Sequence, residues 1–378
     1  MNKKKILLAP NSFKECASST EVTDLFEKFL NTNNNYEIFK YPISDGGDGF
    51  LNVLNYNNKL IDITYSITTP YDGSKFDCTV GYDERNKIIY IESAKVLGLQ
   101  MIPKKRRHPL YLSSKGLGEL LEQVGKSVFN REIDVNKVVI GVGGTGTNDL
   151  GLGLCSIFGM KLIDNYGKEI EIIPENYPKA DKVLWSKPKL PFKIESIIDV
   201  NNPLLGDYGA TYQFAGQKGA TKEEIKLLEK GFNKIINILK NNKLIKPVNS
   251  LPGAGGGLAA GLSLFFDAEC TSSFENFKAD KELIRMMEQS DYVITGEGVF
   301  DKTSLLDKGA NAIIKIFSRQ DKKLFLCCGK IEKDAVKILG KNIFPVEMNE
   351  ITIDNKYKKY FEEEVKIACE KIINLISD

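Results

Sequence analysis

Short β-rich runs that end in polar, glycine-rich segments recur along this 378-residue chain. The first run, at residues 5–9, is followed by a polar loop and then by apolar residues at helical spacing between positions 22 and 30. Ser18 and Glu21 form a capping box at the start of this predicted helix. A second run at residues 36–41 completes a strand–helix–strand unit, which is typical of a parallel sheet with its loops at one edge.

The middle of the chain has a different pattern. We expect about six strands here, at residues 61–69, 76–82, 88–91, 138–140, 194–200 and 211–214. Tight turns between the first three favour antiparallel pairing. Helices are predicted after Ser114 and after a second capping box, formed by Thr221 and Glu224.

Alternating strands and helices return in the last third, with strands at residues 292–295, 324–328 and 343–346. With the first two strands they make a five-stranded parallel sheet. The predicted fold class is α/β with two dissimilar α/β domains. One is a split, Rossmann-like three-layer domain that holds the five-stranded sheet, and the other is an inserted two-layer domain with a mixed sheet. The split domain comprises residues 1–59 and 265–378, the inserted domain comprises residues 60–264, and the active-site cleft is expected between them.

Composition and charge exclude several classes of protein. Lys plus Arg number 52 against 50 for Asp plus Glu, so a basic nucleic-acid-binding surface is not indicated. No run of 18 apolar residues predicts a transmembrane helix, and the start of the chain lacks the apolar region of a signal peptide. Seven scattered cysteines indicate reduced thiols in a cytoplasmic protein. Because His108 is the single histidine, metal sites with two histidines are excluded.

Polar loops follow the first two predicted strands. The first, at residues 9–14, carries Ser12 and Lys14, and a lysine can hold a phosphate or a carboxylate as a point charge. The second reads Ser-Asp-Gly-Gly-Asp-Gly at residues 44–49. Its carboxylates, Asp45 and Asp48, suit Mg²⁺ or could accept the proton of an attacking hydroxyl. The alternative is that both segments are solvated turns, because Asp-Gly is common in turns.

A third glycine-rich loop, at residues 141–149, follows the strand predicted at 138–140. It contains Gly-x-Gly-x-x-Gly, which alone is a weak dinucleotide signal and leaves a nicotinamide-dependent oxidoreductase open. This strand lies in the middle of the chain and does not open a strand–helix–strand unit. The more general interpretation is an anion cradle, in which backbone N–H groups bind a phosphate or a carboxylate. Further polar loops are predicted at residues 199–204, 252–257 and 295–298.

The ordered set of motifs resembles the bacterial-type glycerate kinases, type 1. The matching segments are residues 9–15, 45–49, 91–94, 107–110, 143–149, 199–204, 217–220, 252–255 and 294–298. The resemblance implies ATP-dependent phosphorylation of a hydroxyl of D-glycerate, with 2-phosphoglycerate as the favoured product. It also implies two dissimilar α/β domains, one of them Rossmann-like. The implied cofactors are ATP and Mg²⁺, with no nucleic-acid or membrane partner, and a homodimer is left open.

The same resemblance indicates which residues take part. Catalytic roles are expected for Asp45, Asp199 and Lys14, and Asp45 is preferred over Asp199 for orienting the hydroxyl of the substrate. Substrate or phosphate binding is expected at Ser12, Gly46, Gly47, Arg107, Gly143, Gly144, Thr145, Asn148, Asn201, Lys218, Gly296 and Glu297. Metal binding is expected at Asp48, Asp149 and Asp301. Phosphoryl transfer depends mainly on positioning and on neutralisation of charge.

The chain departs from the family pattern at loops expected to face the ligands. Val299 replaces an arginine, and an aliphatic side chain has neither the charge nor the fork of a guanidinium. Asp307 replaces a glycine, Lys95 replaces a small residue, and Asn11 and Glu15 replace an aspartate and a glycine. These departures leave two alternatives open. One is a kinase of another small hydroxy acid, and the other is a non-catalytic relative that binds a nucleotide or a hydroxy acid.

Overall fold

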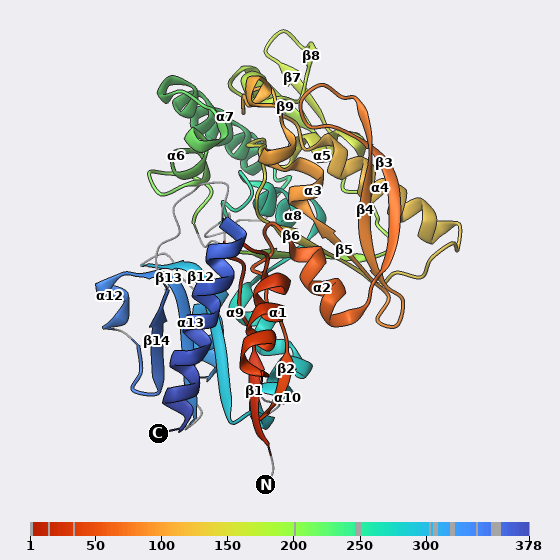
Figure 1. The fold of residues 1–378 in the computed structure, drawn as a ribbon. Coiled ribbons are helices and arrows are strands. Elements are labelled where there is room, and N and C mark those ends of the chain that lie inside the picture. The colour runs from red at the N-terminus through yellow and green to blue at the C-terminus, as the bar shows by residue number, and fades with distance from the viewer. Residues whose placement is uncertain are drawn as a thin grey trace. The chain divides into compact units, whose positions relative to one another are not determined.

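The computed structural model describes residues 3–13, 16–32, 35–199, 202–245, 251–301, 304, 309–317, 322–337, 339–348 and 357–377 (Figure 1). The chain divides into two units. Unit 1 comprises Met1–Asp45, Asn52–Lys59 and Ser272–Asp378, and unit 2 comprises Gly46–Leu51 and Leu60–Thr271. The predicted domain boundaries near residues 60 and 265, and the cleft between the domains, stay predictions.

Unit 1 contains a five-stranded parallel sheet, as predicted. Its strands, in spatial order, are β14 (Ile343–Glu347), β13 (Lys323–Ile331), β12 (Tyr292–Phe300), β1 (Lys4–Leu8) and β2 (Tyr36–Lys40). The central strands are covered on both faces, so consecutive residues such as Ile6, Leu7 and Leu8 are all fully buried. This explains why these strands appear in the sequence as continuous apolar runs.

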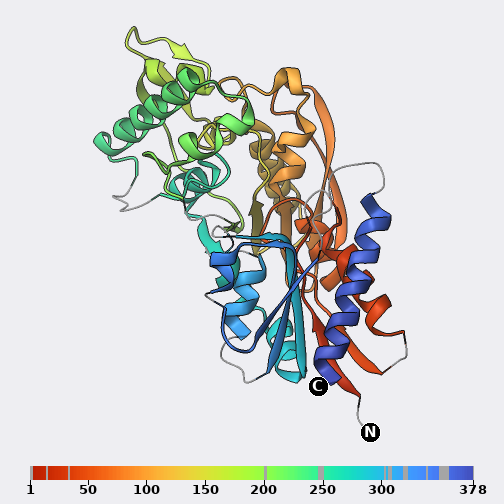
Figure 2. The same ribbon diagram turned by 60° about the vertical axis from the view of Figure 1, so that its left-hand side comes forward.

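Helices cover both faces of the sheet of unit 1 (Figures 1 and 2). Ile6 and Leu8 pack with α1 (Ser19–Leu30) and α13 (Tyr357–Ser377). Leu7 lies on the opposite face, in the same cluster as residues of α9, α10 and α11. These helices are α9 (Ser273–Ala279), α10 (Lys281–Gln289) and α11 (Gly309–Phe317), and the unit also holds α12 (Lys333–Val336). Helix α2 (Phe50–Asn58) begins in unit 2 and continues in unit 1.

Unit 2 contains a six-stranded mixed sheet. Its spatial order is β11 (Glu269–Ser272), β10 (Lys193–Ile198), β6 (Lys137–Val142), β5 (Ile88–Glu92), β4 (Lys75–Asp83) and β3 (Ile61–Thr68). Strands β10, β6 and β5 are parallel, whereas β5, β4 and β3 pair antiparallel, as the tight turns predicted. A second, three-stranded sheet of β8 (Glu169–Ile170), β7 (Lys161–Asp164) and β9 (Ala180–Leu184) was not predicted.

The helices of unit 2 pack with the mixed sheet around one apolar core. They are α3 (Ser93–Leu97), α4 (Lys115–Phe129), α5 (Leu152–Ile157), α6 (Ala210–Phe214), α7 (Lys222–Asn241) and α8 (Leu258–Phe266). Short 3₁₀ helices are η1 (Leu99–Met101), η2 (Lys104–Arg106), η3 (Pro174–Lys179) and η4 (Gly216–Lys218). Both predicted capping boxes are present, at Ser18 with Glu21 and at Thr221 with Glu224. Within the described ranges, no helix has the length and apolar character needed to cross a membrane.

Two predicted elements are wrong. The segment 295–298 is not a loop, because β12 continues to Phe300 and pairs with β13 along this stretch. A Cβ atom at Gly296 would overlap the carbonyl oxygen of Cys327, so this glycine permits the close approach of two strands. Residues 211–214 form part of helix α6 rather than a strand, and the Thr211 hydroxyl hydrogen bonds to Glu229 of α7. This tertiary contact outweighs the β-propensity of the segment.

Candidate active site

Unit 2 places the Gly-Gly-Asp-Gly segment at residues 46–49 against the loop that follows β6. A Cβ atom at Gly143 would lie 2.6 Å from the Cα atom of Gly47, and one at Gly141 would lie 2.7 Å from the carbonyl oxygen of Gly46. The two segments can therefore approach this closely only because residues 141 and 143 are glycines. The Ser93 hydroxyl donates to the Gly143 carbonyl at 3.0 Å and accepts from the Gly143 N–H at 3.2 Å.

Asp48 lies beside Gly144, the exposed residue of this loop. A Cβ atom at Gly144 would be 2.8 Å from Asp48 Oδ1, and Gly144 has a φ of +66°. The backbone next to Asp48 is fixed by the buried Glu92 carboxylate, which accepts the N–H groups of Gly49 and Leu51, each at 3.0 Å. Burial raises the pKa of Glu92. Asp48 itself is exposed, so its carboxylate is open to a ligand beside the loop.

Two backbone hydrogen bonds hold the loop at residues 143–149 in place. The Leu99 N–H donates to the Gly144 carbonyl at 2.9 Å, and the Gly146 N–H donates to the Leu97 carbonyl at 2.7 Å. Among the residues that the structure describes, the loop N–H groups that donate no hydrogen bond are those of Gly144, Thr145, Thr147 and Asn148. Fixed backbone donors without acceptors are what an anion cradle requires.

A buried carboxylate anchors the far end of the loop. Asp149 accepts from the Ser114 N–H and the Ser114 hydroxyl, both at 2.7 Å, and from the N–H groups of Gly151 at 3.1 Å and Gly153 at 3.2 Å. Burial raises the pKa of Asp149, and these hydrogen bonds act in the opposite direction. The geometry thus presents Asp149 as a group that fixes the loop and the start of α5.

A buried cation holds the middle of the loop. The Lys218 side chain, at the end of η4, is 4% exposed, and its Nζ donates to the Thr147 carbonyl at 2.8 Å and to Thr145 Oγ1 at 3.3 Å. Burial lowers the pKa of Lys218 to about 7, and the charge of Asp149 opposes this shift. The loop is therefore clamped between a buried lysine and a buried aspartate.

Behind the cradle, polar groups are buried without partners. In the part of the chain that the structure describes, Thr147 Oγ1 and both side-chain polar atoms of Asn148 have no hydrogen-bond partner. A glycine turn passes over them: a Cβ atom at Gly256 would lie 2.8 Å from Asn148 Oδ1 and would overlap the Thr147 carbonyl oxygen. Unpartnered buried polar atoms are unfavourable and require an explanation.

In unit 1, the loop after β1 runs beside β12. The Asn11 N–H donates to the Gly296 carbonyl at 2.9 Å, and the Ser12 N–H donates to Asn11 Oδ1 at 2.8 Å. The structure thus brings Ser12 near the strand that carries Gly296 and the partly exposed Glu297. Asp45 is the last residue of the Met1–Asp45 segment of unit 1. Its backbone carbonyl accepts a hydrogen bond from the Ser273 hydroxyl at 3.4 Å.

The remaining predicted residues are distributed over both units. Asp199 directly follows β10, the parallel neighbour of β6, and therefore leaves the sheet at the same edge as the loop at 143–149. Arg107 Nε donates to the Ile102 carbonyl at 3.0 Å, and Asp301 Oδ1 accepts the Ser304 N–H at 3.1 Å. Lys14 and Asn201 lie outside the described residues, as does Asp307.

Some residues that shape the site were not among the predicted ones. Glu92 and Ser93 fix the backbone next to Asp48 and Gly143, and Ser114 holds Asp149. A glutamate directly after an apolar β-run was a usable signal, because such a residue leaves the carboxyl edge of a sheet. The turn at residues 255–257 was predicted only as a polar loop, although all three glycines have positive φ.

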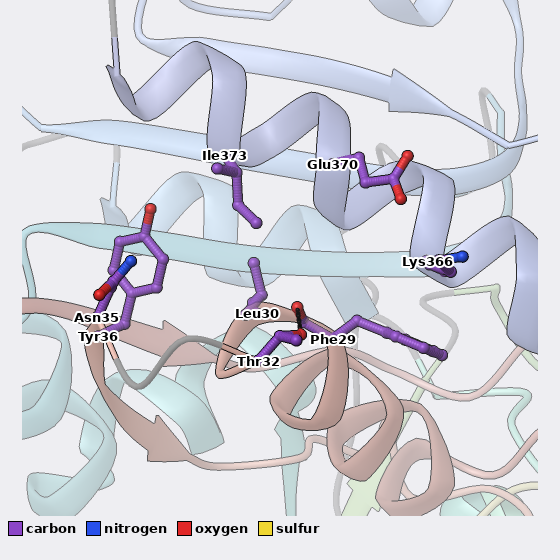
Figure 3. A pocket seen from close by; sticks show the side chains of 8 residues that line it. All are labelled: Phe29, Leu30, Thr32, Asn35, Tyr36, Lys366, Glu370 and Ile373. Atoms are coloured by element: carbon purple, nitrogen blue, oxygen red, sulfur yellow. Dashed lines mark hydrogen bonds between the residues drawn. The ribbon is translucent and has the colours of Figure 1, made fainter.

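The described residues contain no group of three or more His, Cys, Asp or Glu side chains that could hold a metal ion. A cavity of about 280 Å³ does occur in unit 1, between α1, β2 and α13 (Figure 3). It is lined by Phe29, Leu30, Thr32, Asn35, Tyr36, Lys366, Glu370 and Ile373. Figure 3 shows Leu30 and Ile373 pointing toward each other across it. None of the predicted site residues lines this cavity.

Comparisons of the sequence and of the structure with known proteins find similarity to the same family. A sequence model described as the glycerate kinase family matches residues 6–377. The chain is 31% identical to "Glycerate kinase" of Halalkalibacterium halodurans, covering 82% of this chain and 81% of that protein. It is also 31% identical to "Glycerate 2-kinase" of Escherichia coli, covering 87% and 86%. A crystal structure described as glycerate kinase 2 from Salmonella typhimurium LT2 superposes with a TM-score of 0.80 at 27% identity, covering 100% of this chain and 99% of that one.

Proposed function

The chain belongs to the glycerate kinase family and is a kinase, and on that premise we propose that it transfers the γ-phosphoryl group of ATP to a hydroxyl of D-glycerate. We favour 2-phosphoglycerate as the product. The observation that carries the proposal is the loop at residues 143–149, which is clamped from both sides and keeps backbone N–H groups without acceptors.

The loop suits an anionic ligand because its donors are fixed before the ligand binds. The N–H groups of Gly144 and Thr145 stand at its exposed end, and the bonds to Leu97 and Leu99 hold the backbone around them. Donors that need no rearrangement stabilise developing charge more effectively than mobile ones. We propose that the N–H groups of Gly144 and Thr145 bind an anionic oxygen of the substrate or of ATP, and that Gly143, whose N–H donates to Ser93, lets the loop approach the ligand.

Asp48 provides the argument for Mg²⁺. Its Oδ1 atom would lie 2.8 Å from a Cβ atom at Gly144, so an anion bound at the Gly144 N–H would have a carboxylate nearby. A divalent cation held by Asp48 would neutralise this repulsion and supply charge to the transferred phosphoryl group. We propose Asp48 as a metal ligand and keep Asp301 as a second candidate. Asp149 already accepts four hydrogen bonds from the protein, so we propose it as an anchor rather than as a ligand.

The remaining roles are proposals of the same kind. Asp45 is our preferred group for orienting the hydroxyl, with Asp199 second. For phosphate or substrate contacts we propose Lys14, Ser12, Gly46, Gly47, Arg107, Asn148, Asn201, Lys218, Gly296 and Glu297.

The direct test incubates the purified protein with ATP, Mg²⁺ and D-glycerate and follows the product by phosphorus NMR. We expect a phosphoglycerate signal that requires all three components, and its chemical shift identifies the phosphorylated hydroxyl. If ATP binds but no phosphoglycerate forms, the proposed reaction is wrong. A screen of other small hydroxy acids would then separate a kinase of changed specificity from a non-catalytic relative. Val299, which is 49% exposed on β12, is the first residue to revert to arginine in that case.

A further inference from the structure

The hydrogen-bonding needs of Asn148 point to a particular kind of ligand. Within the described residues, Asn148 is the side chain whose polar atoms are both buried without a partner. Its Nδ2 atom requires an acceptor, and its Oδ1 atom requires a donor. The adjacent Thr147 Oγ1, which can both donate and accept, is likewise buried without a partner.

Lys218 adds a further requirement at the same loop. Its ammonium group carries three donors, and it uses two of them, on Thr145 and Thr147. Asp149 does not take the third, because its carboxylate bonds to Ser114, Gly151 and Gly153. The loop therefore lacks acceptors for Lys218 and for Asn148 Nδ2, and also a donor for Asn148 Oδ1.

This combination distinguishes the two substrates of a kinase. The phosphate oxygens of ATP–Mg²⁺ accept hydrogen bonds and do not donate them, so they would leave Asn148 Oδ1 without a partner. A hydroxy acid supplies both kinds of group, since its carboxylate accepts and its hydroxyl donates and accepts. Resting on the proposed function, we propose that the loop at residues 143–149 holds the hydroxy acid rather than the phosphates of ATP. In this arrangement Asn148 hydrogen bonds to the hydroxyl that is not phosphorylated.

The position of Asn148 in the loop fits this assignment. Gly144 at one end is exposed, whereas Asn148 near the other end is completely buried. A carboxylate held at Gly144 would leave the hydroxyl on the side of the buried amide. The turn at residues 255–257 comes close to that amide, since a Cβ atom at Gly256 would lie 2.8 Å from Asn148 Oδ1.

The test measures how strongly the protein distinguishes D-glycerate from acids that lack one hydroxyl. The probes are D-lactate, which lacks the 3-hydroxyl, and 3-hydroxypropionate, which lacks the 2-hydroxyl. Their dissociation constants are measured by calorimetry with Mg²⁺ and a non-hydrolysable ATP analogue present. The variant is Asn148→Ala. The matched control is Asn233→Ala on α7, where the amide already donates to the Glu229 carbonyl at 3.0 Å.

We expect the wild-type protein and Asn233→Ala to bind D-glycerate about tenfold or more tightly than one of the two analogues. In Asn148→Ala, the ratio of the analogue's dissociation constant to that of D-glycerate should fall to about three or less. The reason is that the amide that binds the hydroxyl has been removed. A purely structural role would weaken all three acids equally and leave the ratio unchanged. If Asn148→Ala does not fold, Asn148→Ser serves instead, and its hydroxyl should retain part of the ratio.

An unchanged ratio in a folded variant overturns the assignment of Asn148 and leaves the proposed function standing. Weaker binding of the ATP analogue alone, with the ratio unchanged, would place the nucleotide at the loop and would also overturn it. A wild-type protein that neither binds nor phosphorylates D-glycerate would instead overturn the proposed function and, with it, this assignment.

Discussion

The two units use glycine-rich segments in different ways. In unit 1, Gly296 and Gly298 lie inside β12, where the absence of a side chain at Gly296 lets β13 approach. In unit 2, the glycines at residues 141–146 belong to the end of β6 and the loop that follows, and Gly144 adopts a positive φ. The backbone of the first segment pairs with a neighbouring strand, whereas in the second segment the N–H groups of Gly144 and Thr145 have no acceptor among the described residues. Glycine content alone therefore does not locate a binding site; what matters is whether the backbone groups are already used.

Buried side chains show a similar contrast. Next to Gly296 in unit 1, Cys327 and Cys328 are completely buried thiols, and desolvation raises the pKa of both. Around the loop of unit 2, the buried groups include Asp149, Lys218 and Glu92. Burying ionisable groups is unfavourable unless they are well bonded, so unit 2 holds its loop with interactions that a scaffold alone does not need.

The largest effect is expected from removing the buried anchor of unit 2. Asp149→Ala would leave donors of Ser114, Gly151 and Gly153 without an acceptor and Lys218 without its nearby negative charge. We expect a loss of about 3–5 kcal/mol in the free energy of unfolding, measured by urea denaturation. Asp301→Ala in unit 1 is the comparison, with an expected loss of about 1 kcal/mol. If Asp149→Ala and Asp301→Ala lose the same unfolding free energy, the buried carboxylate of unit 2 does not stabilise its loop more than an ordinary surface carboxylate would.

The two kinds of glycine can be separated by parallel substitutions. Gly296→Ala should lower the free energy of unfolding by about 3 kcal/mol, because the new methyl group meets the backbone of Cys327. Gly144→Ala should cost only about 1–2 kcal/mol, from its positive φ, but should strongly reduce glycerate phosphorylation because the methyl group would push against Asp48. Thermal unfolding measures the loss of stability in each variant, and an assay of glycerate phosphorylation measures the loss of activity. Retention of full activity by Gly144→Ala would contradict the role of the loop.

Lys218 should make the stability of the protein depend on pH. Its pKa in the folded state is about 7, below the ordinary value of 10.5, so the unfolded chain binds more protons between these limits. The penalty for burying the charge is then fully present below pH 7 and is relieved as the pH rises toward 10.5. Relative to Lys218→Met, the wild-type protein should gain about 2 kcal/mol of unfolding free energy between pH 7 and pH 9. Urea denaturation at both pH values measures this difference. If the unfolding free energy of the wild type and that of Lys218→Met change equally with pH, Lys218 keeps an ordinary pKa and the prediction is wrong.

The sequence predicted strands best where both faces of the strand are buried, because burial then produces a continuous apolar run. Strands β1, β12 and β13 are buried on both faces, so they stand out as apolar runs. The three-stranded sheet was missed because its strands are short and mix apolar with charged residues, as in Lys161–Asp164. The end of β12 was missed because glycine occurs in loops and also where another backbone approaches a strand closely.

At the site, the sequence indicated residue types but not their surroundings. The loop at residues 143–149 was predicted from its glycines and the strand before it. Lys218 was predicted to be a clamp for a phosphate or a carboxylate, and this stays a prediction; its burial to 4% exposure, which is rare for lysine, could not be read from the sequence. The unpartnered amide of Asn148 depends on a turn more than 100 residues away in the sequence, at Gly256, so no local pattern could reveal it.

The most direct test of the central claim compares Asp48→Asn with Asp62→Asn, the same substitution at an exposed residue of β3. Both variants are assayed for phosphoglycerate formation with ATP, Mg²⁺ and D-glycerate. If Asp48 acts with the loop at 143–149 in phosphoryl transfer, Asp48→Asn should reduce kcat about 100-fold or more while its melting temperature stays near that of the wild type. Asp62→Asn should keep the wild-type rate. Near-normal kcat in Asp48→Asn would contradict the placement of the phosphoryl-transfer centre at this loop.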